Sequence, residues 1–283
     1  MSFMSHAARG ALLGFAALAL PVSAQNSAGP SLAVFGVPLG GTVADIERMA
    51  GQRGFGGLTD HCQAARICRY RVNIENLQDT EFFSTSWGFR RLADRTEAFS
   101  FAFTAPPNEH RIWSAGSDQS FGDWFNVSAS APILPDVLAE LRKRFGEPVR
   151  TQGLEARRAN AGNHGQLWWL WDAEGRPVRW TRETHQTCYL AMGRASVETG
   201  LTLHVNSNAA PVDPQPFLRA RQGNCAYAVR ADIGHTRGLV YSLSIRAVDF
   251  KAGHDAQYRT NQLLREKRGE ADSARSNRNR PDF

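Results

Sequence analysis

The chain has 283 residues, with 33 lysines and arginines against 27 aspartates and glutamates and a formal net charge of +6. The basic residues are scattered among acidic ones and form no continuous stripe, which argues against a nucleic-acid partner. A chain of this length can form one large domain or two domains of the usual size, about 100–150 residues each.

Residues 1–24 have the organisation of a secretory signal peptide. Arg9 gives a short basic segment, residues 10–20 are apolar and uncharged, and Val22-Ser23-Ala24 is a small-residue cleavage site. No later stretch approaches the roughly 20 apolar residues that a membrane-spanning helix needs. We therefore expect cleavage after Ala24, no membrane span, and a soluble mature chain in the periplasm or outside the cell.

Residues 25–130 are predicted to form a first helix-plus-sheet module. Thr42 reads as a helix N-cap with Asp45 three residues later, a variant of the capping box, and Gly51 ends the apolar stripe. The stripe consists of Ile46, Met49 and Ala50. Strands are predicted at residues 66–73 and 99–104, the second because phenylalanines alternate with small residues. Edge strands at residues 111–113 and 124–127 are predicted around turns at Gly116 and Gly122.

Residues 131–269 are predicted to form a second module, which opens with a helix from about Pro135 to Gly146. Pro135 suits the first helical position and Gly146 followed by Pro148 ends the run. Its apolar positions are Val137, Leu138, Leu141 and Phe145. Strands are predicted at 167–171, 178–180, 188–192, 201–205, 225–229 and 239–245, with a helical turn at 217–221 and a closing helix at 255–268. Residues 270–283 are predicted to be a disordered polar tail.

Four cysteines, an even number, fit an exported protein with disulfide bonds. Four cysteines allow three pairings, and proximity in the chain favours one bond in each half. The favoured pairs are Cys62 with Cys68 and Cys188 with Cys225. His61 and His185 lie near cysteines, but neither has a partner pair at the spacing of a zinc site, so no metal is expected.

Four of the seven tryptophans lie close together in one predicted hairpin. They are Trp168, Trp169, Trp171 and Trp180. Alternation places Trp168 on the face opposite Trp169 and Trp171, so both faces carry large apolar groups. In one interpretation these side chains pack in the core and against a helix or a neighbouring module. In the other, one face is exposed and forms a binding site for a protein or glycan.

Two short segments carry a resemblance to a known family. Phe35-Gly36-Val37-Pro38-Leu39-Gly40 leads into the first helix, and the second helix ends in Arg144-Phe145-Gly146-Glu147-Pro148. Both segments resemble tandem periplasmic modules of the β-lactamase-inhibitor-protein-like and outer-membrane-assembly-lipoprotein-like kind. The second helix lacks the Gly-rich entry of the first. The resemblance implies helices packed on antiparallel sheets and an interaction module without a catalytic centre, and it transfers no contact residue to this chain.

Motifs that carry catalysis or bind cofactors are missing from the sequence. It has no G-x-S-x-G elbow, H-E-x-x-H pair, Walker loop or G-x-G-x-x-G fingerprint, and no cofactor is expected. Seven histidines of the expected mature chain are scattered, at positions 61, 110, 164, 185, 204, 235 and 254. The carboxylates of Asp94 and Glu97 are close in sequence, but a solvated turn explains them better than acid–base chemistry.

The sequence therefore predicts an α+β fold of two related modules, each with helices packed on an antiparallel β-sheet. The leading functional hypothesis is a non-enzymatic binding or inhibitor-type module that recognises a protein of the bacterial envelope. The alternative is a hydrolase of an envelope polymer whose catalytic residues come together only in the fold. A structural envelope component is a third interpretation, and the oligomeric state stays open.

Overall fold

The computed structural model describes residues 30–55, 67–72, 80–104, 107, 111–155, 162–189, 191–192 and 215–278. The predicted signal peptide and the predicted strand at residues 201–205 lie outside this part of the chain. In chain order the strands and helices are β1 (Ala33–Val34), β2 (Val37–Pro38), α1 (Val43–Arg53), β3 (Ile67–Val72), β4 (Thr80–Arg91), β5 (Thr96–Phe103), β6 (Ile112–Ser120), α2 (Leu134–Phe145), β7 (Arg150–Gln152), β8 (Asn163–Trp171), α3 (Arg182–Thr184), the π-helical turn η1 (His185–Tyr189), α5 (Gln215–Gln222), β9 (Tyr227–Thr236), β10 (Leu239–Asp249) and α6 (Phe250–Arg278).

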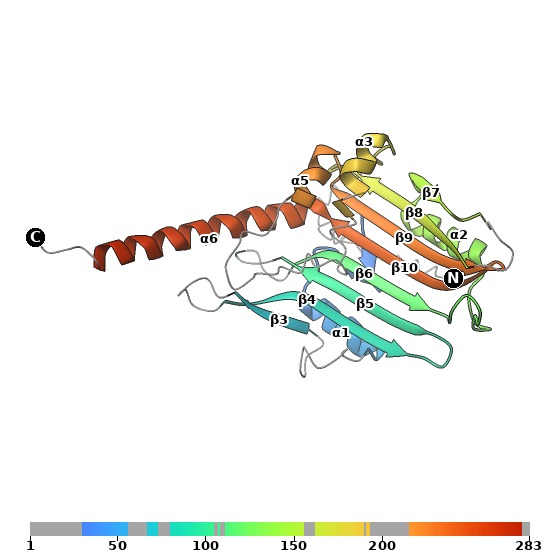
Figure 1. Ribbon diagram of the computed structural model, residues 1–283. Helices are drawn as coiled ribbons and strands as arrows, with labels where there is room; N and C mark the ends of the chain where they lie inside the picture. Colours follow the sequence, from blue (N-terminus) through green and yellow to red (C-terminus); the bar gives the residue numbers. More distant parts are fainter. Residues whose placement is uncertain are drawn as a thin grey trace, which may run out of the picture.

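Eight strands form one antiparallel sheet in the order β3-β4-β5-β6-β10-β9-β8-β7 (Figure 1). Each half of the chain contributes four consecutive strands, and the two sets meet where β6 pairs with β10. This pairing runs from Ser114 opposite Val248 to Ser120 opposite Ser242. The α+β fold class is confirmed, but the two halves share a single sheet where two separate sheets were predicted.

Helix α1 forms where the capping pattern predicts it. The backbone N–H of Thr42 donates a 2.8 Å hydrogen bond to Asp45 Oδ2, and the Thr42 hydroxyl donates to the same oxygen. These bonds lower the pKa of Asp45, led by the one from the backbone. The helix passes Gly51 and ends at Gly54, whose φ of 69° is the left-handed conformation that favours glycine.

Helix α2 also matches its prediction. Pro135 lies in the first turn, and the chain leaves the helix at Gly146, where φ is 80°. The buried residues of α1 and α2 all belong to the predicted apolar stripes, namely Ile46, Met49, Ala50, Val137, Leu141 and Phe145. The spacing of apolar residues therefore identified the packed face of each helix.

Both helices pack on the same face of the sheet, which we call the helix face (Figure 1). Its main core residues from the strands are Phe99, Phe101, Phe103, Leu167, Trp169, Trp171, Val229, Ala231 and Ile245. Residues of both halves of the chain are in this one hydrophobic cluster. The two halves therefore share a core as well as a sheet.

A smaller cluster covers one end of the opposite face. It includes Trp168, Leu170, Cys188, Met192, Ala220 and Phe250, beneath α3, η1, α5 and the start of α6. Residues 188–192 were predicted to be a strand, but Cys188 lies in the π-helical turn. The predicted strand at 178–180 is also wrong, because only an isolated bridge joins Pro177 to Trp171.

The C-terminal helix α6 is longer than predicted and extends beyond the sheet (Figure 1). Asp249 precedes it and accepts a 2.8 Å hydrogen bond from the N–H of Ala252, as an N-cap does. Residues 270–278, expected to be disordered, are helical. None of the helices in the described part of the chain is both long enough and apolar enough to cross a membrane.

The remaining differences concern strands. Residues 112–120 form one central strand, β6, and Gly116 lies inside it where a turn was predicted. Residues 124–127 belong to a loop rather than to an edge strand, closed by a bridge between Gly122 and Val127. Strand β4 was not predicted, although it pairs with β5 over seven residues, from Thr85 to Arg91.

Candidate functional site

The predicted tryptophan cluster is a packing feature. Trp168 and Trp169 are each 1% exposed, on opposite faces of β8, and Trp171 is also buried. Trp180 is half-buried, and the guanidinium of Arg150 lies 4.5 Å from the centre of its ring. The burial agrees with the interpretation in which both faces of this strand are packed.

The predicted bond between Cys188 and Cys225 is present, with a Cα–Cα distance of 6.0 Å. It joins η1 to the segment before β9, whereas two neighbouring strands were expected. Cys68 lies in β3, but its predicted partner Cys62 is outside the described residues. The Cys188–Cys225 bond holds the helical segments over one end of the sheet.

The rest of the face opposite α1 and α2 is not covered by any helix of the described chain, and we call it the open face (Figure 1). The strand registers place on it Arg91, Thr96, Ala98, Ser100, Asp118, Ser120, His164, Gln166, Arg230, Asp232, Ser242, Ser244 and Arg246. Most of these residues are polar or charged. An antiparallel sheet with one apolar and one polar face commonly presents the polar face to solvent.

Arg246 is the central charged group of the open face. Its side chain is 3% exposed and donates two 3.0 Å hydrogen bonds from Nη2 to the carboxylate of Asp118. It lies across Gly116 of the neighbouring strand, where a Cβ atom would come within 2.9 Å of Arg246 Cδ. Glycine at this position therefore makes room for an arginine lying flat on the sheet.

A second charged group lies one strand further along. Arg230 Nε donates a 2.6 Å hydrogen bond to Asp232 Oδ2, and the amide of Gln166 donates a 2.7 Å bond to Asp232 Oδ1. The guanidinium of Arg230 also lies 5.5 Å from the centre of the Trp168 ring. These contacts hold the charged side chains of the open face in fixed positions.

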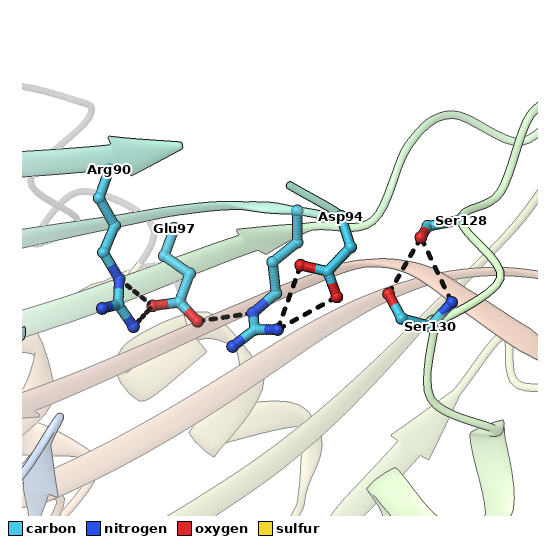
Figure 2. Close-up of polar contacts among 6 residues, drawn as sticks. Arg90, Asp94, Glu97, Ser128 and Ser130 are labelled. Carbon is cyan, nitrogen blue, oxygen red and sulfur yellow. Dashed lines mark hydrogen bonds and ion pairs between the residues drawn. The ribbon is translucent and has the colours of Figure 1, made fainter. Parts of the chain in front are cut away.

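The turn between β4 and β5 borders one end of the open face. Glu97, which is buried, accepts hydrogen bonds from Arg90 Nε at 2.7 Å and from Arg95 Nε at 2.8 Å (Figure 2). Burial opposes the ionisation of Glu97, but these two arginines outweigh it and lower its pKa. Arg95 also contacts Asp94, whose pKa is lowered chiefly by a hydrogen bond with Ser130. The two carboxylates expected in a solvated turn are thus parts of an ordered ion-pair network.

The loop of residues 121–127 lies beside this turn and carries two exposed aromatic residues. Trp124 is 38% exposed and Phe125 is 77% exposed. The carboxylate of Asp123 accepts hydrogen bonds from the N–H groups of Phe125 and Asn126, at 2.9 and 2.8 Å. An Asx turn therefore fixes the backbone that presents the aromatic pair.

Tyr241 and His164 form a pair near this loop. The hydroxyl of Tyr241 is 3.1 Å from His164 Nε2. A Cβ atom at Gly162 would lie 3.0 Å from Trp124 Cβ and 3.2 Å from the Tyr241 hydroxyl, so Trp124 and Tyr241 are close neighbours. Gly162 therefore lies between Trp124 of the loop and the Tyr241 hydroxyl.

A cavity of about 470 Å³ lies between the β4–β5 turn and this loop. Its lining includes Arg91, Arg95 and Thr96 on one side and Ser120, Asp123 and Asn126 on the other. This cavity is shallow and largely open to solvent, so it is a concave part of the surface rather than an enclosed ligand pocket. We define the candidate site as this cavity, the Trp124–Phe125 pair and the adjoining open face.

A second cavity, of about 430 Å³, lies at the start of α6. It is lined by Ala173, Arg221, Asn224, Cys225, Ala226, Phe250, Lys251, His254 and Asp255. Asp255 accepts a 2.6 Å hydrogen bond from Lys251 and lies 3.3 Å from His254 Nδ1. No serine, threonine or free cysteine is among these lining residues.

The other histidines are dispersed. His185 stacks on Tyr189, and His235 is buried on the helix face. Positions 61, 110 and 204 lie outside the described residues. Within the described ranges, no group of three histidine, cysteine, aspartate or glutamate residues could hold a metal ion.

No family model matches the chain, and no curated protein or solved structure is similar to it.

The sequence did not identify Trp124 and Phe125 as site residues, because they were assigned to an edge strand. The available signal was the order Gly122-Asp123 before the two aromatic residues, which is typical of a turn that presents them. Their exposure depends on the neighbouring β4–β5 turn and on Tyr241, and these come from distant parts of the chain.

Proposed function

We propose that this protein is a non-enzymatic binding or inhibitor-type protein that recognises another protein of the bacterial envelope through its open face. The observation that carries the proposal is the exposed pair Trp124 and Phe125 beside a cavity at the end of that face. Tryptophan is among the residue types that dominate the energetic centres of protein interfaces, and interfaces are enriched in phenylalanine. A loop that exposes both residues next to a concave surface provides such a centre.

The fixed charges on the open face support the same proposal. Arg230 is held by Asp232, and Asp118, which is 43% exposed, is held by the buried Arg246, so Arg230 and Asp118 lose little conformational freedom on binding. Arg91 is exposed and has no ion-pair partner among the described residues. Charged groups at an interface mainly give specificity and faster association, whereas the aromatic pair provides affinity.

The two-module organisation is part of the proposal. Each half has one helix, α1 or α2, followed by four antiparallel strands, with α3, η1 and α5 inserted between β8 and β9 in the second half, and this shared order supports a relation between residues 25–130 and 131–269. It also supports the resemblance to tandem modules of the β-lactamase-inhibitor-protein-like kind. In this proposal the junction of β6 and β10 brings the two modules together to form one wide binding face.

A periplasmic or secreted location is proposed for two reasons. The sequence begins with a segment of signal-peptide character, and Cys188 is bonded to Cys225. Disulfide bonds form and persist mainly in oxidising compartments. The partner should therefore be a protein of the same compartment.

The alternative, a hydrolase of an envelope polymer, is favoured by one observation. His254 and Asp255 form a close pair in the cavity at the start of α6. A histidine oriented by a carboxylate is a common general base. Lys251 already engages this carboxylate, however, and none of the described lining residues offers a hydroxyl or a free thiol as a nucleophile. The binding function therefore has the stronger support.

Native affinity capture with the disulfide intact tests the proposed function. The mature protein would serve as bait for its own envelope extract, and a saturable protein partner is expected. Hydrogen–deuterium exchange of the purified complex should then show protection in residues 91–97 and 120–127, with no change in α1 or α2. Protection confined to α6, or the lack of any saturable partner, would overturn the proposal.

A further inference from the structure

We propose that the cavity at the start of α6 binds a small carboxylate with an apolar body. This cavity is separate from the candidate site, because none of its lining residues belongs to the open face or to the loop of residues 121–127. It lies where α5 and α6 meet the end of the sheet (Figure 1). The inference does not depend on the proposed protein partner.

The floor of the cavity is apolar and rigid. Phe250 is 2% exposed, Ala226 is buried, and Cys225 is fixed by its bond to Cys188. The N–H of Ala226 donates to the Trp171 carbonyl at 2.8 Å, and the N–H of Phe250 donates to the Ala226 carbonyl at 2.8 Å. This backbone is therefore fully engaged and offers a shaped apolar surface to a ligand.

One wall carries an unpaired cation. Arg221, at the end of α5, is exposed, and no described carboxylate pairs with its guanidinium. Asn224 follows it at a φ of 54°, in the left-handed conformation, and places its own side chain at the same cavity. A guanidinium binds a carboxylate through two parallel hydrogen bonds, and an amide can add a third.

The opposite wall is close to neutral. Asp255 is the only acid among the described lining residues, and its two oxygens are engaged by Lys251 Nζ at 2.6 Å and by His254 Nδ1 at 3.3 Å. Its pKa is lowered, because the contacts with Lys251 and His254 outweigh desolvation. The opposite charges of Lys251 and Asp255 therefore offset each other, and Arg221 is left as the uncompensated charge.

These features define the class of ligand. One uncompensated cation matches a singly charged carboxylate better than a doubly charged phosphate, which would face Asp255 without a second free cation. A volume of about 430 Å³ accommodates an aromatic or aliphatic body against Phe250 and the disulfide. The ligand is thus a small amphipathic acid.

The test compares two matched probes, N-acetyl-L-phenylalanine and its uncharged amide. Chemical-shift titration of the mature protein should give saturable binding of the acid at millimolar concentrations, with shifts centred on residues 224–226 and 250–255. The Arg221→Gln substitution should weaken binding of the acid at least tenfold, the range expected for a lost charged hydrogen bond. The amide should bind weakly, and equally to both proteins.

Arg219→Gln provides the control, since Arg219 lies on the same helix but does not line the cavity. It should leave the affinity for the acid unchanged. Equal binding of the acid and the amide would overturn the assignment of a carboxylate site. Shifts that fall elsewhere, or the lack of any saturable shift, would overturn the site itself.

Discussion

The indole N–H of Trp169 donates a 2.9 Å hydrogen bond to the carbonyl oxygen of Gly146, so the end of α2 is attached directly to strand β8 of the sheet. The Trp169 ring also packs against Phe145, with ring centres 5.3 Å apart. One buried side chain thus satisfies a carbonyl at the helix end and fills the space beneath the helix.

Substituting Trp169 with phenylalanine should lower the free energy of unfolding by about 1–2 kcal/mol. The change removes the hydrogen bond to Gly146 and leaves a small void beside Phe145. Denaturant unfolding measures the effect. Trp124→Phe is the matched control, because Trp124 is on the surface, and it should change stability by less than about 0.5 kcal/mol.

Removing the Cys188–Cys225 bond should destabilise the protein. The two cysteines are separated by 37 positions in the sequence. From the entropy of closing such a loop, removing the bond should lower the free energy of unfolding by about 3.9 kcal/mol at most. Replacing both cysteines with alanine should lower the midpoint of denaturant unfolding. A reductant should lower the midpoint of the wild type but should have little further effect on this variant, which lacks the bond. A double variant as stable as the wild type would contradict the structural role of the bond.

Replacing Asp118 with alanine should destabilise the open face by about 1–3 kcal/mol. Arg246, at 3% exposure, would lose its two hydrogen bonds to the Asp118 carboxylate, while Asp118 itself is 43% exposed and easily hydrated. The double variant Asp118→Ala with Arg246→Met should be more stable than Asp118→Ala alone, because it also removes the buried charge. A double variant less stable than the sum of the two single changes would contradict this explanation.

The stability of the protein should fall as the pH is lowered below about 6.5, in part because of His235. Burial is the main cause that lowers the pKa of His235, and the nearby His164 adds to it, while a backbone hydrogen bond with Gly153 opposes it. His235 therefore binds a proton more readily in the unfolded chain than in the folded one. Its contribution to the stability of the fold is complete above pH 6.5 and is lost as the pH falls below that value. Nε2 of His235 has no hydrogen-bond partner within the described residues.

Denaturant unfolding at pH 8, 6 and 5 measures this pH dependence. The His235→Gln variant should show a flatter dependence than the wild type. Identical slopes for the wild type and His235→Gln would contradict the assignment.

Local signals predicted the helices well. Thr42 and Asp45 form the predicted cap of α1, and Gly146 ends α2, because both features depend on residues within one or two turns. The buried stripes of the two helices follow from spacing alone. Period-two alternation likewise identified β5, where Phe99 and Phe101 face the core.

Predictions failed where the structure depends on distant residues. Gly116 was read as a turn, but it lies in β6, where it pairs with Ser100 of β5 and with Arg246 of β10, 130 positions later. Cys188 was placed in a strand, since an apolar run does not reveal whether a helix or a strand buries it. The candidate site could not be predicted for the same reason: its turn and loop meet through the pairing of β5 with β6, and its open face is completed only by the pairing of β6 with β10.

The most direct test of the proposed binding function is the affinity of the captured partner for two matched variants. Trp124→Ala combined with Phe125→Ala removes the exposed aromatic pair of the candidate site, and Tyr258→Ala removes an equally accessible ring from α6. The double variant should bind the partner at least thirtyfold more weakly, as expected for the loss of an energetic centre worth 2 kcal/mol or more, while Tyr258→Ala should bind within about twofold of the wild type. A double variant that folds normally and binds within twofold of the wild type would contradict the account.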